Sequence, residues 1–204
     1  MQVSRIECEL REVVLRDKPP CMLSASPKGT VPVLIHGEAN VLEESLDIML
    51  WALRQNDPQH WLPAEGPLDQ ALALVARNDD EFKYHLDRYK YENRHEAAEP
   101  QVDHRAAAST FLLDLEARLC QTPWLLGSAL SLADAAVAPF VRQFANTDRA
   151  WFDSQPWPKL IAWLDDFLRS ALLASVMDKH KQWAPGDATT IFPCSEEASW
   201  QRSL

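Results

Sequence analysis

An acid and a hydroxyl, Glu44 and Ser45, stand together where an apolar strand pattern gives way to a helical one. A helix start with a serine hydroxyl can hold a carboxylate, and a glutamate can pair with an ammonium group. The α-carboxylate and α-amine of an amino acid would suit this pair. The same residues also suit plain capping, with Ser45 as the N-cap of the helix. Taken alone, the two residues leave both roles open.

A proline opens a β-branched strand pattern earlier in the chain, at Val31-Pro32. If the bond between them is cis, the Val31 N–H and C=O can face outward and accept an extended peptide. The alternative is an ordinary proline at the start of an edge strand. Both alternatives place an exposed strand edge at this point.

Other residues that could do chemistry form no constellation. The six histidines show no metal-ligand spacing, and none of the motifs HExxH, GxSxG or GxxxxGK[ST] occurs, so we predict no metal site and assign no catalytic residue. Cys8 lies in a strand pattern and Cys21 follows two prolines, so neither thiol is expected at the start of a helix. The aromatic residues from Phe82 to Tyr91 suit either core packing or a wall for an apolar ligand.

The elements that must position these residues fall into two parts. Residues 1–57 carry strand patterns at 7–15, 31–35 and 39–42, followed by a helix. Prolines and a glycine mark residues 58–67 as a linker. Residues 68–193 show only helical periodicity, and 194–204 show none and are predicted to form a tail. In the helical part, Ser131-x-x-Asp134 predicts a capping box.

The bulk composition is that of a globular protein, with 47% hydrophobic and 25% charged residues in 204. A formal charge of −10 argues against nucleic acid or an anionic membrane as a partner. No apolar run approaches the ~20 residues of a transmembrane helix, and no signal-peptide core opens the chain. The four cysteines are scattered, which favours reduced thiols and a cytoplasmic location.

The order of three motifs resembles the cytosolic glutathione transferase family, in particular its bacterial, omega-like members. The motifs are SPKGTVPVL at 26–34, ESLDI at 44–48 and LSLAD at 130–134. The resemblance covers the chain to about Pro193. It implies a thioredoxin-like domain followed by an all-helical domain.

The resemblance also implies a binding site for glutathione as co-substrate. In it, a cis bond before Pro32 lets the Val31 backbone pair with the cysteinyl part, and Glu44 and Ser45 hold the γ-glutamyl end. Lys18 matches a basic residue that reaches the glycyl carboxylate. A hydrophobic electrophile or mixed disulfide would lie near the helix that carries Phe82 to Tyr91, and the family is typically homodimeric.

The chain departs from the family pattern at its start. In the family, a further strand and helix precede the strand that residues 7–15 match, and the catalytic Cys, Ser or Tyr lies at the start of that helix. We therefore expect an incomplete, N-terminally truncated thioredoxin-like domain, an unknown catalytic residue and weak or absent transferase activity. The function implied is conjugation of glutathione or thiol exchange. The alternative is a non-catalytic adaptor that binds protein, as in starvation-response relatives.

Overall fold

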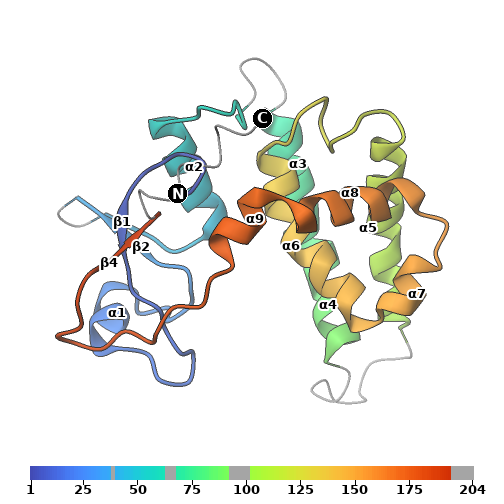
Figure 1. Cartoon of the computed structure of the whole chain (residues 1–204). Helices are drawn as coiled ribbons and strands as arrows, with labels where there is room; N and C mark the ends of the chain where they lie inside the picture. The colour runs from blue at the N-terminus through green and yellow to red at the C-terminus, as the bar shows by residue number, and fades with distance from the viewer. Residues whose placement is uncertain (38–39, 63–67, 92–101, 194–204) are drawn as a thin grey trace. The chain divides into compact units, whose positions relative to one another are not determined.

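The computed structural model describes residues 1–37, 40–62, 68–91 and 102–193. The chain forms two compact units (Figure 1). Unit 1 contains residues 1–59 together with the chain from Ala171 onward, and unit 2 runs from His60 to Ser170. Unit 1 mixes short strands and helices, whereas the described residues of unit 2 form only helices, turns and loops. The predicted combination of an α/β part and an all-helical part is therefore confirmed.

The strands of unit 1 form two small antiparallel sheets. In one, β1 (Cys8–Leu10) pairs with β4 (Thr190–Phe192), and Cys8 lies opposite Phe192. In the other, β2 (Leu34–His36) pairs with β3 (Asn40–Leu42). The strand predicted at 31–35 begins only at Leu34. One reason is that Pro32 has no N–H to donate to a ladder.

The helices of unit 1 are α1 (Pro20–Ala25), α2 (Ser45–Gln55) and α9 (Ala171–Val176). Pro20 is the first residue of α1, a position where a missing N–H costs nothing. The expectation that Cys21 lies away from a helix start is therefore wrong, because Cys21 is the second residue of α1. Glu44, not Ser45, is the N-cap residue of α2, and its side chain makes no capping hydrogen bond. Of the two roles left open for Ser45, that of the N-cap residue is therefore excluded.

The end of the described chain departs from the predicted domain boundaries. Residues 68–193 were predicted to form the helical domain, but residues from Ala171 onward belong to unit 1. In Figure 1 the orange-red chain that follows α9 returns to the blue N-terminal strand. A strand as short as β4 has too few residues to show alternation, so periodicity along the chain does not detect it.

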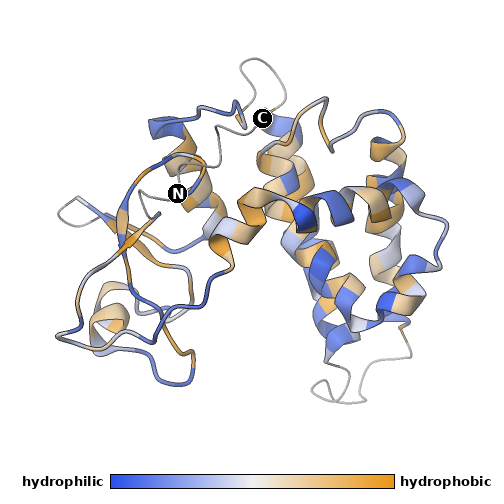
Figure 2. Cartoon of the chain, in the orientation of Figure 1, coloured by the Kyte–Doolittle hydropathy of each residue, from blue (hydrophilic) through white to orange (hydrophobic). Residues whose placement is uncertain are grey.

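Unit 2 is built from one nearly continuous helical run and the helices that follow it. This run consists of α3 (Leu68–Arg77), a π-helical turn (Asn78–Phe82) and α4 (Lys83–Lys90). The other helices are α5 (His104–Leu119), α6 (Leu132–Thr147), α7 (Arg149–Asp153) and α8 (Pro158–Arg169). Figure 2 shows both apolar and polar residues along α6 and α8, as expected of amphipathic helices.

Aromatic rings occupy the centre of unit 2. The buried Phe82 ring lies 5.1 Å from Phe111 and 5.7 Å from Phe144, measured between centroids. The Tyr89 ring also packs against Phe144, with 5.0 Å between the centroids. Of the two roles open for this aromatic cluster, core packing is therefore the one that Phe82 and Tyr89 have. Tyr84 differs, because it is exposed and stacks under the Arg88 guanidinium.

The predicted capping box starts α6 and reaches further than the sequence suggests. Asp134 is fully buried and accepts hydrogen bonds from the Ser131 N–H at 2.9 Å and the Ser131 hydroxyl at 2.7 Å. Its second oxygen accepts from the Leu125 N–H and from the Trp163 indole N–H, both at 2.9 Å. One carboxylate thus joins the loop before α6, the start of α6, and α8.

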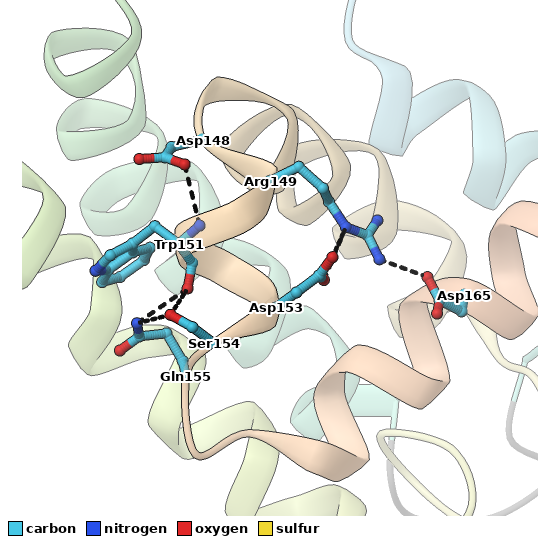
Figure 3. A network of polar contacts seen from close by, with 7 residues as sticks. All are labelled: Asp148, Arg149, Trp151, Asp153, Ser154, Gln155 and Asp165. Carbon is cyan, nitrogen blue, oxygen red and sulfur yellow. Dashed lines mark hydrogen bonds and ion pairs between the residues drawn. The ribbon is translucent and has the colours of Figure 1, made fainter.

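A second polar network fixes α7. Asp148 caps the helix by accepting from the Trp151 N–H at 3.0 Å. Figure 3 shows the Arg149 guanidinium between Asp153 of α7 and Asp165 of α8, at 2.8 Å from each. These two carboxylates raise the pKa of Arg149.

Two histidines connect α4 to the start of α5. The Nδ1 atoms of His85 and His104 are 2.9 Å apart and the ring centroids are 5.2 Å apart. The rings therefore meet nitrogen to nitrogen, with one Nδ1 donating and the other accepting. Burial lowers the pKa of His85, helped by the charges of His104 and Arg88 and opposed by Glu81.

We expect the free energy of unfolding to fall as the pH is lowered from about 7 to about 5, the range in which histidine titrates. Because the folded-state pKa of His85 is lowered, the unfolded chain takes up this proton at a higher pH than the folded chain does. The stability is complete above the unfolded pKa and is lost progressively as the pH falls from that value through the lower folded-state pKa. Urea denaturation over this pH range measures the effect.

The matched control is His85→Asn, whose amide can hydrogen-bond near the Nδ1 position but does not titrate. This variant should show a flatter pH dependence than the wild type. Carboxylates titrate in both proteins, so the difference between the two curves isolates the histidine. Equal slopes would contradict the prediction.

Candidate functional site

The turn at residues 26–29 is joined to the start of α2 by two side-chain contacts. The buried Ser26 hydroxyl donates to the Glu43 carboxylate, and the Lys28 ammonium pairs with the Glu44 carboxylate. The Glu44 carboxylate raises the pKa of Lys28. The turn itself closes through the Gly29 N–H, which donates to the Ser26 carbonyl at 2.9 Å.

Gly29 has a φ of +65°, a conformation that favours glycine. A Cβ at this position would lie 3.8 Å from the Lys18 Nζ atom. Lys18 therefore lies beside the turn that carries Lys28. Two ammonium groups and the Glu44 carboxylate gather around this one turn.

Val31 follows the turn directly. The Val31–Pro32 peptide bond is cis, as the family resemblance implied. Val31 is 47% exposed. Within the described residues, its N–H and C=O make no hydrogen bond. An extended peptide could therefore pair with this backbone without breaking an existing bond.

The start of α2 offers N–H groups that have no partner inside the helix. The first intrahelical bond runs from the Ile48 N–H to the Glu44 carbonyl at 3.1 Å, so the N–H groups before Ile48 point out of the helix. Glu44 and Ser45 are both exposed there. A carboxylate is the group that a helix N-terminus favours.

All of the predicted binding residues therefore lie in unit 1, at or next to this turn and the start of α2: Lys18, Val31, Pro32, Glu44 and Ser45. Lys28 was not among the predicted binding residues. Only its positive charge could have drawn attention to it, since its pairing with Glu44 bridges two separate elements. Among the described residues, no group of three or more potential metal-ligating side chains occurs.

The two cysteines of unit 1 with a described environment differ from each other. Burial raises the pKa of the Cys8 thiol, which therefore stays protonated at neutral pH. Cys8 lies in β1, in agreement with the strand pattern that contains it. Cys21 is exposed; the pKa of Arg11 is raised mainly by its hydrogen bond to the Glu9 carboxylate, with a smaller contribution from Cys21.

Models of two protein domains match the sequence between residues 1 and 166. Residues 1–61 match the glutathione S-transferase N-terminal domain, and residues 64–166 match the glutathione S-transferase C-terminal domain. The chain belongs to the glutathione S-transferase family. The fold implied by the order of its motifs, a thioredoxin-like domain and a helical domain, is thereby confirmed.

Solved structures of other glutathione transferases are similar in fold. One from Xanthobacter autotrophicus Py2 has 23% identity and a TM-score of 0.60, with 74% of each chain covered. One from Pseudomonas fluorescens Pf-5, solved with two glutathione bound, has 18% identity and a TM-score of 0.62, covering 76% of this chain and 74% of its own. A class Gtt2 transferase of Vibrio parahaemolyticus has 17% identity and a TM-score of 0.64, covering 80% and 81%.

A comparison with curated protein sequences finds no match. The omega-like subclass, the truncation and the homodimer implied by the resemblance therefore stay predictions. In the part of the chain that the structure describes, no helix is both long and apolar enough to cross a bilayer.

Proposed function

We propose that this family member binds glutathione in unit 1, at the turn 26–29 and the start of α2. The observation that carries the proposal is the pair of contacts Ser26–Glu43 and Lys28–Glu44. These contacts join the N-terminus of α2 to the turn that precedes the unpaired Val31 backbone.

The groups around the turn fit the three residues of glutathione. The Glu44 carboxylate takes the γ-glutamyl ammonium, and the Ser45 hydroxyl and the first N–H groups of α2 take the neighbouring carboxylate. The Val31 N–H and C=O pair with the cysteinyl backbone, as in the addition of a strand to a sheet edge. Lys18 takes the glycyl carboxylate.

The reaction that this binding serves is transfer of the glutathione thiol to a hydrophobic electrophile, or thiol exchange with a mixed disulfide. Glutathione supplies the sulfur nucleophile in both cases. The residues of this site hold the peptide at three points, so that its thiol is presented in a fixed place.

Isothermal titration of the purified chain with glutathione tests the proposal. The matched control ligand is the isomer in which glutamate is linked through its α-carboxyl group, since it keeps every charge but moves the ammonium. We expect binding of glutathione and much weaker binding of the isomer. If neither tripeptide binds, the proposal fails and the protein-binding adaptor becomes the better account.

A further inference from the structure

The chain after α9 returns along the segment that leads to Lys18. We call residues 181–192 the C-terminal segment. The Trp183 N–H donates to the Glu12 carbonyl at 3.0 Å, and β4 pairs with β1 further along. The Arg11 guanidinium lies 4.5 Å above the Trp183 ring. Figure 1 shows this red chain beside the blue strand β1.

One contact of the C-terminal segment reaches the residue before Lys18. The Gln182 side-chain amide donates to the Asp17 carboxylate at 2.9 Å. The Asp17 N–H in turn donates to the Val14 carbonyl at 2.8 Å, which closes a turn. Both the backbone and the side chain of Asp17 are therefore held by hydrogen bonds.

Lys18 lies between this anchor and a second rigid point. Pro19 and Pro20 follow it, and Pro19 has φ −67° and ψ 141° as the residue before α1. A residue that precedes proline is restricted to extended conformations. With Pro19 fixing one side, the direction in which Lys18 leaves the chain depends on where Asp17 is held.

The C-terminal segment is itself braced at the point where it touches Asp17. The Asp187 carboxylate accepts from the Ala184 N–H at 2.8 Å and from the Lys181 ammonium at 3.0 Å. These contacts lower the pKa of Asp187, so its carboxylate stays charged at neutral pH. Gln182 lies inside this braced turn.

We propose that Gln182 is a positioning residue for glutathione binding. Through Asp17 it holds Lys18 beside Gly29, where the ammonium receives the glycyl carboxylate. The inference rests on the proposed function and adds to it a part for the C-terminal segment, which lies far from Lys18 in the sequence.

The test compares two ligands that differ only at the glycyl end, glutathione and γ-glutamylcysteine. Gln182→Ala should weaken glutathione about threefold, the usual size of one lost hydrogen bond, and leave γ-glutamylcysteine unchanged. Lys18→Ala should give the same pattern with a larger loss. Because both act through Lys18, the double variant should bind glutathione no more weakly than Lys18→Ala alone.

Two further variants separate positioning from general damage. Gln182→Lys keeps a donor facing Asp17 and should retain wild-type affinity for glutathione. Gln155→Ala removes a similar side-chain amide, one that donates to the Trp151 carbonyl in unit 2, and should change neither ligand. Thermal unfolding of each variant checks that the fold is intact.

Each contrary result has a distinct meaning. Equal weakening of both ligands by Gln182→Ala, or no weakening at all, would overturn the positioning role while Lys18→Ala still discriminates the ligands. If Lys18→Ala also fails to discriminate, the assignment of Lys18 falls together with that of Gln182. A wild-type chain that binds neither ligand would overturn the proposed function and this inference with it.

Discussion

Replacing Asp134 by alanine should lower the free energy of unfolding by about 3–4 kcal/mol, the range for breaking a buried hydrogen-bond network. The side chain is fully buried and accepts from Ser131, Leu125 and Trp163. Its removal would leave the Leu125 and Trp163 N–H groups without an acceptor and without access to water. Urea or guanidinium denaturation, followed by tryptophan fluorescence, measures the change.

Two companion variants make the Asp134 result specific. Asp134→Asn keeps the volume of the side chain, but its amide nitrogen would face N–H or O–H groups that need an acceptor. We therefore expect this variant also to lower the free energy of unfolding strongly. Asp148→Ala removes an exposed cap of α7, which should cost only about 1 kcal/mol. A loss for Asp134→Ala no larger than that for Asp148→Ala would show that the buried network contributes little.

Replacing Glu44 by glutamine should weaken glutathione binding about tenfold or more, the equivalent of one charge-assisted hydrogen bond to an ammonium group. The glutamine keeps the size of the side chain and removes only its charge. The Lys28–Glu44 pair has to open as the ligand enters. This costs little, because both side chains are about half exposed and such pairs are weak. Isothermal titration at constant ionic strength gives the affinities.

An analogue of glutathione without the α-amine tells whether Glu44 acts on the ammonium. Glu44→Gln should leave the affinity for this analogue unchanged. Asp47→Asn removes a negative charge from the same first turn of α2 and should change glutathione binding only slightly. Loss of affinity for the analogue and for glutathione alike would mean that Glu44 supports the helix start and does not contact the ligand.

The sequence predicted best where each feature depends on residues close together. The helix expected after the strand 39–42 is present as α2, and the box Ser131–Asp134 predicted the start of α6. The sequence predicted less well the bounds of short helices and strands, because these depend on contacts with segments that are distant in the sequence. The strand predicted at 7–15 covers only Cys8–Leu10, and the short helix α1 begins at Pro20, so that Cys21 lies at a helix start where none was expected.

The family and the two-part fold follow from the sequence by itself, because the motifs and the helical periodicity are local properties of the chain. Only the tertiary structure decides three things about the candidate site: that Lys28 pairs with Glu44, that Lys18 lies beside Gly29, and that the chain after Ala171 returns to unit 1. The contact between Gln182 and Asp17 spans 165 residues of sequence. No pattern along the chain reports such a contact, because it forms only after the path of the folded backbone has brought both residues together.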